Sequence, residues 1–488
     1  MKIVGREKEI NLLESLLEQD EASFVAVYGR RRVGKTYLVR QVYKKQMVFD
    51  CSGVLRGDTA QQLENFWRTL SDNYPKKVPN TPPKTWIEAF FQLRGVLNTL
   101  KSDAPKVIFL DEIAWFETLN SGFLSALDGF WNQYCTKRSD IILVICGSAA
   151  SWIIEKVIND RGGLHNRLTN RMLLKPFTLG ETKAFLESKK VRLTLKEIAQ
   201  IYMSVGGIPF YLKDIKAGFS VPQILDQLFF EEQALLKDEF QNLYAALFKN
   251  NTFHETIVAA LAGKNKGLTR NEIIQASGVK SGGGLSLVLE ELVQCGFIKQ
   301  IFPITKSKEE RLYRLIDEFS LFHYKFLAQG QETNSWSLIT QKQSFKIWSG
   351  YSFENLCFKH IAQIKQALGI SGVITNEYSY TFKGNADTQG VQIDMMIERA
   401  DNCMNLLEVK FHDKEFVVSK DYEQELREKV AIFREQTRTR KSIFVTMLSA
   451  YGVKKNEHYL SVVTNQLLID DLFTWFYEII GFMAQRTF

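Results

Sequence analysis

Eight consecutive residues near the N-terminus have the types and the spacing that holding a phosphate group requires. The segment 29–36 reads GRRRVGKT and fits the pattern GxxxxGK[ST], after a short β-prone run and at the start of a helical stretch. Its glycines allow the backbone to bend around a phosphate with the N–H groups pointing inward. Lys35 would bridge the β- and γ-phosphates of ATP and Thr36 would ligate Mg²⁺; the competing interpretation is a basic loop that fits the pattern by chance. The expected nucleotide-binding residues are Gly29, Arg30, Arg31, Arg32, Val33, Gly34, Lys35 and Thr36.

A second set of polar residues follows two further apolar runs. The run 107–110 ends at Asp111 and Glu112, and in a parallel sheet such residues emerge at the carboxyl edge, beside a phosphate-binding loop. We expect Asp111 to hold Mg²⁺, directly or through water, and Glu112 to polarise the attacking water as a general base. The alternative is a strand that ends in charged residues because the sheet ends there. Ser148 follows the run 141–145 and could sense the γ-phosphate, with an ordinary strand-end turn as the alternative.

Strands that alternate with helical segments predict a parallel sheet covered by helices. The β-prone runs are 24–28, 107–110 and 141–145. Residues 178–248 have Glu, Lys and Leu at helical spacing, interrupted by the segment 206–209. The N-terminal part is therefore expected to be an α/β domain followed by a helical region.

These motifs together resemble those of P-loop ATPases of the AAA+/STAND superfamily. The segment 4–7 resembles the N-terminal GRE box of these proteins, and the resemblance places Arg6 at the nucleotide. The segments 146–148 and 162–167 resemble the stretch that follows their fourth core strand. Gly207-Ile208-Pro209 is similar to the GxP signature of the STAND lid, which implies that Pro209 packs against the adenine; outside that context it would be a turn. The likeness extends over nearly the whole chain to an archaeal and bacterial ATPase family whose C-terminal domain has no known function.

The resemblance also implies an arginine that reaches the γ-phosphate. Arg167 is the candidate for this arginine finger, Arg161 and Arg171 compete for the role, and a surface salt-bridge arginine is the alternative. Because such a finger could act in cis or from a neighbouring subunit, a homo-oligomer stays open.

The middle of the chain, residues 250–320, contains three helical segments and then two β-prone runs, and it resembles the winged helix that follows the lid in STAND proteins. Thr269 and Glu272 form a capping-box pair at the start of one helix. The next helix, expected over 281–293, offers a single lysine at its start and two glutamates later. A helix that reads DNA normally presents Arg, Lys, Asn or Gln to base edges and cations to phosphates. We therefore favour an intramolecular docking role for this module, with sequence-specific DNA binding as the alternative.

Two acidic residues and a lysine lie on neighbouring β-prone runs of the C-terminal part. Asp394 precedes the turn pair Asp401-Asn402, and Glu408 and Lys410 follow it. A hairpin centred on Asp401 sets Asp394 opposite Glu408, with Cβ atoms about 5 Å apart, and Lys410 on the same face. Two carboxylates this close need a cation or a proton between them. Mg²⁺ or Mn²⁺ suits oxygen ligands, and a nearby lysine can orient or deprotonate a metal-activated water.

This arrangement resembles the core of the PD-(D/E)xK nuclease superfamily, which implies a metal-dependent phosphodiesterase site built from Asp394, Glu408 and Lys410. The resemblance also assigns Glu354, on an upstream helix expected over 353–367, as a supporting metal ligand. Ile393 stands where the motif has proline, and this departure leaves the activity open. The alternative is an acid and a lysine that are simply solvated on a strand face.

The composition is that of an ordinary globular protein, since 45% of the 488 residues are hydrophobic and 24% are charged. It excludes a wholly disordered, collagen-like or disulfide-scaffold chain. The net charge of +7 arises before residue 341, because residues 341–488 hold equal numbers of basic and acidic side chains. The six scattered cysteines form no CxxC pair and are expected to be buried thiols. Without a signal-peptide pattern or a bilayer-spanning window, we expect a cytoplasmic protein with no membrane partner.

The sequence therefore predicts an α/β multidomain protein. A P-loop NTPase parallel sheet is expected over residues 1–178, a helical lid over 179–248, a winged helix over 249–335 and an α/β restriction-endonuclease-like domain over 336–488. The expected function is a Mg²⁺-dependent ATPase switch coupled to nucleic-acid binding or cleavage, with ATP as ligand and DNA as a partner of the C-terminal domain. The alternative is a regulatory switch whose winged helix and C-terminal domain only bind partners.

Overall fold

The computed structural model describes most of the chain and divides it into two compact units. The first unit comprises Met1–Pro176 and Ala246–Lys249, and the second comprises Phe177–Ala245 and Asn250–Phe488. The predicted division into four domains stays a prediction. The described residues are 3–100, 104–148, 150–158, 167–248, 251–302, 304, 311–328, 335–382, 384 and 390–474.

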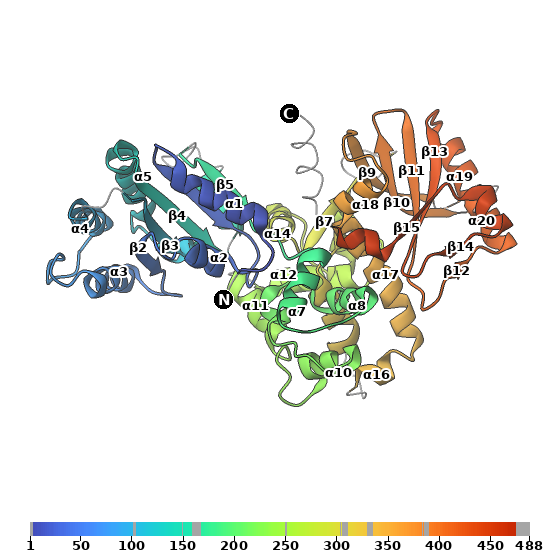
Figure 1. The fold of residues 1–488 in the computed structure, drawn as a ribbon, viewed down its shortest axis with the longest axis horizontal. Helices are drawn as coiled ribbons and strands as arrows, with labels where there is room; N and C mark the ends of the chain where they lie inside the picture. The colour runs from blue at the N-terminus through green and yellow to red at the C-terminus, as the bar shows by residue number, and fades with distance from the viewer. Residues whose placement is uncertain are drawn as a thin grey trace. The chain divides into compact units, whose positions relative to one another are not determined.

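The first unit is built on a five-stranded sheet in which every pairing is parallel (Figure 1). The strand order is β2-β3-β4-β1-β5, so β4 lies between β1 and β3. The three predicted strands are confirmed as β1, β3 and β4, whereas β2 and β5 were not predicted. The strands are β1 (Ser23–Tyr28), β2 (Met47–Ser52), β3 (Lys106–Asp111), β4 (Ile141–Gly147) and β5 (Asn170–Leu173).

Helices of the first unit bury apolar side chains against this sheet. Phe66, Trp86 and Phe123 are almost completely buried, and Trp86 makes edge-on ring contacts with the other two. Helix α3 begins with a capping box in which Asp58 and Gln61 satisfy each other's backbone N–H groups. The principal helices are α1 (Glu7–Ser15), α2 (Lys35–Val42), α3 (Thr59–Asn73), α4 (Trp86–Asn98) and α5 (Phe123–Gln133).

The second unit begins with a helical region, as the spacing of residues 178–248 predicts. Thr178 and Glu181 form the capping box of α7, and Thr194 and Glu197 form that of α8. A β-carbon at Gly207 would lie 2.0 Å from the carbonyl oxygen of Phe177, so only glycine fits at this crossing. The helices are α7 (Leu179–Ser188), α8 (Leu195–Val205), α9 (Pro209–Leu212), α10 (Val221–Leu225) and α11 (Glu239–Leu247).

A small module of three helices and three short strands follows. The strands pair antiparallel in the order β6-β8-β7, and the predicted capping box of Thr269 and Glu272 is confirmed at α13. The helix predicted over 281–293 begins instead at Gly283, after Gly282 in an extended conformation. The elements are α12 (Asn251–Ala262), β6 (Leu268–Thr269), α13 (Arg270–Ser277), α14 (Gly283–Gln294), β7 (Ile298–Ile301) and β8 (Leu312–Leu315).

The C-terminal part contains a mixed five-stranded sheet in the order β15-β13-β11-β10-β9 (Figure 1). Strands β9, β10 and β11 pair antiparallel, whereas β11, β13 and β15 pair parallel. The elements of this sheet are β9 (Thr375–Phe382), β10 (Val391–Arg399), β11 (Cys403–Lys410), β13 (Ser442–Ser449) and β15 (Asn465–Leu468).

Helices and two short strands complete this part of the second unit. Residues 372–374 form the turn before β9, and the helix expected over 353–367 is interrupted at His360. The elements are α15 (Glu318–Phe322), α16 (Trp336–Ile339), α17 (Gln343–Lys359), α18 (Ile361–Ala367), β12 (Phe416–Val417), α19 (Lys420–Thr437), β14 (Val453–Lys454) and α20 (Glu457–Val462).

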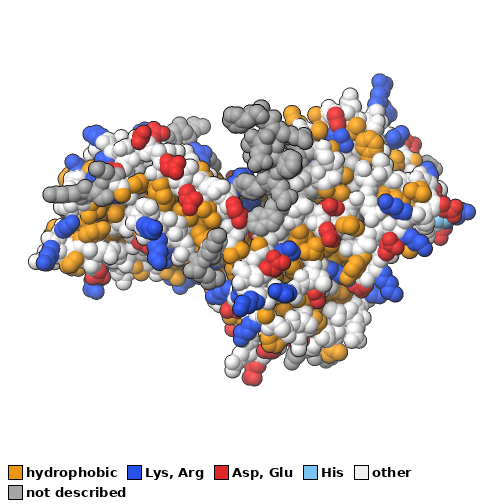
Figure 2. Space-filling model, in the orientation of Figure 1, with side chains coloured by type: hydrophobic (Ala, Val, Ile, Leu, Met, Phe, Trp, Pro, Cys, Tyr) orange, Lys and Arg blue, Asp and Glu red, His pale blue; other side chains and the backbone are white. Residues whose placement is uncertain are grey.

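The surface agrees with the modest net charge. On the face drawn in Figure 2, Lys and Arg side chains are interspersed with Asp and Glu side chains. All six cysteines are free, and five of them are buried, as expected from their apolar surroundings. Within the described ranges, no helix is both long enough and apolar enough to cross a bilayer.

Candidate functional site

The loop between β1 and α2 adopts a conformation that its glycines make accessible. Gly29, Arg32 and Gly34 all have positive φ angles, of 141°, 71° and 93°. A β-carbon at Gly29 would lie 2.4 Å from the carbonyl oxygen of Leu174, so this position excludes every larger residue. The loop therefore bends tightly and leads directly into the N-terminus of α2 at Lys35.

Lys35 lies inside this loop. Its side chain is buried, and Nζ donates hydrogen bonds to the carbonyl oxygens of Gly29 (2.9 Å) and Arg30 (3.0 Å). Arg6 is also buried and donates from Nη2 to the carbonyl oxygen of Val33 at 3.3 Å. The structure thus brings Arg6 of the predicted GRE box to the loop, where its cation adds positive charge.

Thr36 and Asp111 meet at the carboxyl edge of the sheet. The Thr36 hydroxyl donates to Asp111 Oδ2 at 2.9 Å, and the backbone N–H of Glu112 donates to Asp111 Oδ1 at 3.0 Å. Ser52, at the end of β2, donates to the same carboxylate at 3.4 Å. Ser52 was missed by the sequence reasoning, and so was Arg40, which pairs with Asp50 and also contacts Ser52.

Glu112 and Ser148 also lie together, at the ends of the adjacent strands β3 and β4. The Glu112 carboxylate accepts hydrogen bonds from the Ser148 hydroxyl and from its backbone N–H. Glu112 has a φ angle of 50°, a left-handed conformation that is uncommon for a non-glycine residue. Burial raises the pKa of the neighbouring Cys146 thiol well above its usual value, and the Asp111 carboxylate adds to the effect, so this cysteine stays neutral.

The arginine-finger candidates differ in their surroundings. Arg167 is exposed, and its Nε lies 3.9 Å from the carboxylate of Asp128 on α5, so it has a surface ion-pair partner. Arg171 lies on β5 beside β1. Burial raises the pKa of Tyr28 on β1, and the Arg171 charge partly opposes this rise. Arg161 and the segment 162–166 lie outside the described residues. The finger therefore stays a prediction.

Pro209 belongs to the second unit, where it occupies the first turn of α9. Phe177 donates its N–H to the carbonyl oxygen of Gly207 at 2.6 Å and accepts a hydrogen bond from the Tyr202 hydroxyl at 2.7 Å. These contacts hold the Gly-Ile-Pro segment against Phe177, in the loop before α7. The contact of Pro209 with adenine stays a prediction.

The C-terminal hairpin has the register that its turn pair predicts. Met395 pairs with Leu407 and Met396 with Leu406, which is the pairing of a hairpin centred on Asp401. Asp394 directly precedes Met395 and Glu408 directly follows Leu407; the side chain of Asp394 lies outside the described residues. A register shift occurs between Ile393 and Met396 in the pairing of β10 with β9. The pairs with β11 extend from Met395 to Glu398, so the opposition of Asp394 and Glu408 stays a prediction.

Glu408 is almost completely buried and is surrounded by donors. Lys429 Nζ lies 2.9 Å from Oε1, the Tyr422 hydroxyl donates to Oε2 at 3.0 Å, and Lys410 Nζ lies 3.7 Å from Oε2. Burial lowers the pKa of Lys429, but the Glu408 and Glu425 carboxylates together outweigh burial, so the net shift of the pKa is upward. Lys410 was predicted from the sequence, whereas Lys429 and Tyr422, both on α19, were not.

Glu354 joins this cluster from α17. Burial raises the pKa of Glu354, and the Glu408 carboxylate adds to the rise, whereas Arg314 and Lys410 oppose it. Arg314, itself buried on β8, donates from Nη2 to Glu354 Oε2 at 3.0 Å. Among the described side chains, which do not include Asp394, no three His, Cys, Asp or Glu residues are grouped as a metal site requires. The metal role of the cluster stays a prediction.

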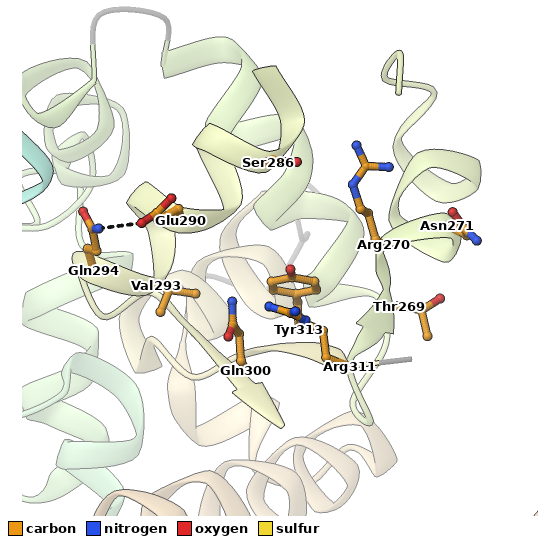
Figure 3. Close-up of a pocket in the computed structure, with 10 residues that line it drawn as sticks. All are labelled: Thr269, Arg270, Asn271, Ser286, Glu290, Val293, Gln294, Gln300, Arg311 and Tyr313. Atoms are coloured by element: carbon orange, nitrogen blue, oxygen red, sulfur yellow. Dashed lines mark hydrogen bonds between the residues drawn. The ribbon is translucent and has the colours of Figure 1, made fainter. Parts of the chain in front are cut away.

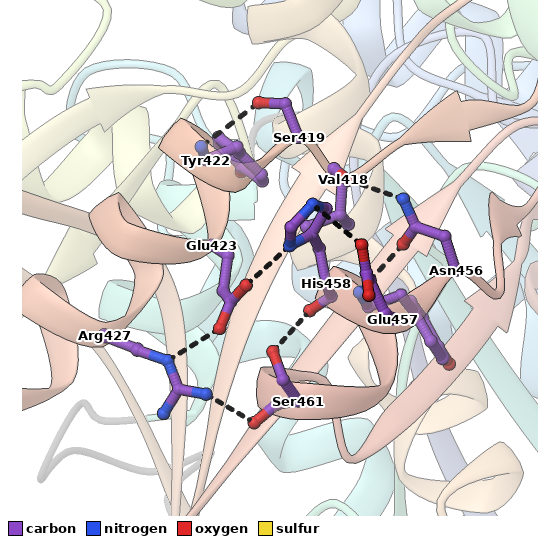
Figure 4. Close-up of polar contacts among 10 residues, drawn as sticks. Val418, Ser419, Tyr422, Glu423, Arg427, Asn456, Glu457, His458 and Ser461 are labelled. Atoms are coloured by element: carbon purple, nitrogen blue, oxygen red, sulfur yellow. Dashed lines mark hydrogen bonds and ion pairs between the residues drawn. The ribbon is translucent and has the colours of Figure 1, made fainter.

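Helix α19 is fixed in place by polar contacts with α20, so its Tyr422 and Lys429 are held at Glu408. Glu423 accepts from Arg427 Nε at 2.9 Å and pairs with His458 Nδ1 at 2.8 Å (Figure 4). Arg427 also donates to the carbonyl oxygen of Ser461 at 3.0 Å. Hydrogen bonds from the side chains of Ser461, His458 and Arg427 lower the pKa of the Glu423 carboxyl to about 2.

A polar groove of about 780 Å³ lies on the three-helix module of the second unit. It is lined by residues from β6, α13, α14, β7 and β8 (Figure 3). Arg270 donates to the Ser281 hydroxyl at 3.1 Å, and Gln294 donates to Glu290 at 3.1 Å across one turn of α14. The groove therefore mixes guanidinium, amide and carboxylate groups.

Comparison with known proteins gives one family and several relatives. Residues 3–215 match the family described as an ATPase domain predominantly from Archaea. The uncharacterised protein MJECL04 of Methanocaldococcus jannaschii is 28% identical over 373 residues, which cover 74% of this chain and 78% of that protein. The uncharacterised ATP-binding protein MJ0439 of the same organism is 25% identical over 287 residues, covering 50% of this chain and 76% of that protein.

Among solved structures, the Walker-type ATPase paby2304 of Pyrococcus abyssi aligns with a TM-score of 0.47 at 18% identity, over 66% of this chain and 96% of that chain. The family match covers the whole phosphate-binding loop and the strands that carry Asp111, Glu112 and Ser148. The chain therefore carries a P-loop ATPase domain in residues 3–215, built on a parallel sheet.

Proposed function

We propose that this chain is a Mg²⁺-dependent ATP-hydrolysing switch of the STAND type. The observation that carries the proposal is the convergence of Lys35, Thr36, Asp111 and Glu112 at one edge of the parallel sheet, with Ser148 bound to Glu112. The family match and the ATP-binding relative MJ0439 support ATP as the ligand.

The donor set at Thr36 and Asp111 fits Mg²⁺. The Thr36 hydroxyl and an Asp111 carboxylate oxygen lie 2.9 Å apart. Two ligands at adjacent corners of an octahedron with bonds of about 2.0–2.1 Å are separated by about the same distance. Both are hard oxygen donors, and Asp111 is buried. When bound, the ion would neutralise charge on the β- and γ-phosphates.

The chain's own residues supply the rest of the hydrolysis step. Lys35 would leave the carbonyl oxygens of Gly29 and Arg30 for the phosphates, and the loop N–H groups would bind their oxygens. Glu112 would accept a proton from the attacking water as the water oxygen forms a bond to the γ-phosphorus. The bond to the β,γ-bridging oxygen breaks, which yields ADP and phosphate.

The ATPase proposal is tested by two substitutions with one matched control. Lys35→Ala should abolish ATP binding in a titration calorimeter. Glu112→Gln should retain binding and lower kcat by about 10²–10⁴-fold, the usual contribution of a general base. Lys44→Ala, in the turn after α2, should change neither. Normal turnover by Glu112→Gln would exclude Glu112 as the base.

The second unit would respond to the nucleotide and act on nucleic acid. We propose that residues 251–315 form a winged helix, supported by their three helices and the antiparallel β6-β8-β7 sheet. The C-terminal part would be a nuclease-like domain, with Asp394, Glu408 and Lys410 as a phosphodiesterase site and Glu354 as a supporting ligand. The hairpin register supports this assignment, and so does the influence of the Glu408 and Lys410 charges on the pKa of Glu354.

A purely regulatory switch is the second candidate, and the groove in Figure 3 favours it. Its mixed polar lining suits a partner protein, in agreement with the acidic residues of α14. The two candidates separate on incubation of plasmid DNA with Mg²⁺ or Mn²⁺, with and without ATP. Cleavage that is lost in Glu408→Ala and kept in the control Glu428→Ala supports the phosphodiesterase. No cleavage by the unmodified chain supports the regulatory switch.

A further inference from the structure

A cleft of about 280 Å³ lies within the second unit, between the three-helix module and the strands that carry the acidic cluster. The module contributes the turn before β6 and strand β8, and the C-terminal part contributes α17, β9 and β10. The side chains or backbone of five residues in its lining bear on its chemistry and size: Lys266, Arg314, Gly350, Glu354 and Gln392.

The cleft adjoins the proposed phosphodiesterase site. Gln392 and Ile393 of β10 line the cleft, and Ile393 directly precedes Asp394 in the chain. Glu354 lines the cleft, and the charges of Glu408 and Lys410 act on its pKa in opposite directions, the first raising it and the second lowering it. A molecule bound in the cleft would therefore reach the acidic cluster.

The lining of the cleft suits an anionic, hydrogen-bonding ligand. Arg314 is 4% exposed, and its Nε has no hydrogen-bond partner among the described residues, although its Nη2 pairs with Glu354. Lys266 is an exposed cation at the rim. Glu354 is the one carboxylate of the lining, and Arg314 already balances it, so the cleft is net positive through Lys266.

We propose that this cleft binds one nucleotide of a single-stranded nucleic acid, with Lys266 and Arg314 holding the backbone phosphate beside the acidic cluster. The inference rests on the proposed phosphodiesterase function of that cluster. The cleft is slightly smaller than typical small-molecule sites of about 300–1,000 Å³. It has room for a single nucleotide and not for a duplex, so a base pair must be opened before a strand can enter.

The first test measures binding of a short fluorescein-labelled single-stranded DNA to the full chain by anisotropy, with Mg²⁺ and over a salt titration. Lys266→Ala should weaken binding about five-fold and lower the slope of log K against log salt by about 0.7, as loss of one phosphate contact predicts. Lys264→Ala is the matched control, because it removes an exposed lysine from the same turn, outside the cleft lining. It should leave the slope unchanged.

The second test fills the cleft. A β-carbon at Gly350 meets no atom within 4 Å, and Gly350 lies within α17, so Gly350→Leu introduces a bulky side chain at a helical position. This variant should weaken binding of the single strand at least ten-fold. Gly95→Leu is the control, because Gly95 is also helical and has open space around its β-carbon.

Wild-type affinity in both Lys266→Ala and Gly350→Leu would overturn the proposal. Tighter binding of a blunt-ended duplex of the same sequence than of the single strand would also overturn it. Cleft-dependent binding without any cleavage supports the cleft and removes the phosphodiesterase function. Cleavage that is insensitive to Gly350→Leu supports the phosphodiesterase function and removes the cleft as its binding site. The two failures are therefore distinguishable.

Discussion

Ser148 binds the Glu112 carboxylate twice, through its hydroxyl at 2.9 Å and through its backbone N–H at 3.1 Å. The two residues follow adjacent parallel strands, β3 and β4, so the sheet itself sets their separation. A general base must direct one oxygen at the attacking water, and a carboxylate held at two points has little rotational freedom to lose. In the proposed hydrolysis step, Ser148 would be a positioning residue for Glu112.

We therefore expect Ser148→Ala to lower kcat for ATP hydrolysis about ten-fold, with KM changed less than two-fold. The backbone N–H remains in this variant, which is why the loss should be smaller than that for Glu112→Gln. Ser148→Thr retains a hydroxyl and should recover most of the rate. If Ser148→Ala raises KM and leaves kcat unchanged, Ser148 contacts the nucleotide and does not orient the base.

Substitution of Gly207 is expected to destabilise the fold. Its β-carbon would overlap the backbone of Phe177, which is too rigid to yield. Gly207→Ala should therefore lower the free energy of unfolding by about 3 kcal/mol, measured by urea titration. Gly350→Ala is the matched substitution in the same unit, and it should stabilise the protein by up to about 1 kcal/mol because α17 has open space there. Equal effects of the two substitutions would contradict the clash.

The nucleotide loop could be predicted from the sequence because its chemistry is local. Gly29, Gly34 and Lys35 lie within one short segment, and each has a conformational or electrostatic reason to be where it is. Asp111 and Glu112 could be found because an unbroken apolar run ends at them. The hairpin register was predictable too, since the turn at Asp401 fixes it.

Partners from distant segments could not be predicted. Strand β2 reads MVFDCS, where polar residues interrupt the apolar ones, so neither the strand nor Ser52 could be recognised. Lys429 and Arg314 reach Glu408 and Glu354 from other elements, and nothing in their local pattern shows which way they face. The break at His360 depends on tertiary contacts, since the residues on both sides favour a helix.

Lys429 is predicted to stabilise the fold through Glu408. Its Nζ lies 2.9 Å from a carboxylate that is 1% exposed. Lys429→Met keeps the length of the side chain and removes the charge, so it leaves the buried carboxylate poorly compensated. The free energy of unfolding at pH 7 should fall by about 3 kcal/mol, whereas Lys420→Met, at the exposed start of α19, should change it by less than about 0.5 kcal/mol.

The same variant tests the metal assignment. If Mg²⁺ binds Asp394 and Glu408, the ion can replace the missing ammonium at Glu408. Millimolar Mg²⁺ should then raise the melting temperature of Lys429→Met more than that of the unmodified chain. Equal shifts in the two proteins would count against a cation at this carboxylate.

The buried side chain of His360 is expected to make the free energy of unfolding depend on pH. It is buried, its Nε2 accepts a hydrogen bond from the Leu179 N–H at 3.0 Å, and its Nδ1 lies 2.8 Å from the carbonyl oxygen of Leu356. Both contacts are satisfied by the neutral ring with the proton on Nδ1, and protonation of Nε2 would break the first. Burial lowers the pKa of His360 to about 4, against about 6.5 in the unfolded chain.

Because the folded pKa lies below the unfolded one, the unfolded chain binds more protons between these two values. The contribution of His360 is fully present above about pH 6.5 and is lost as the pH falls to about 4, and it amounts to about 3 kcal/mol. Burial also lowers the pKa of His323 to about 4, so His323 adds a similar increment. His360→Gln should therefore reduce the slope of unfolding free energy between pH 4.5 and 6.5 by about half, measured by urea titration at each pH. A slope equal to that of the unmodified chain would show that His360 takes up its proton without breaking the bond to Leu179.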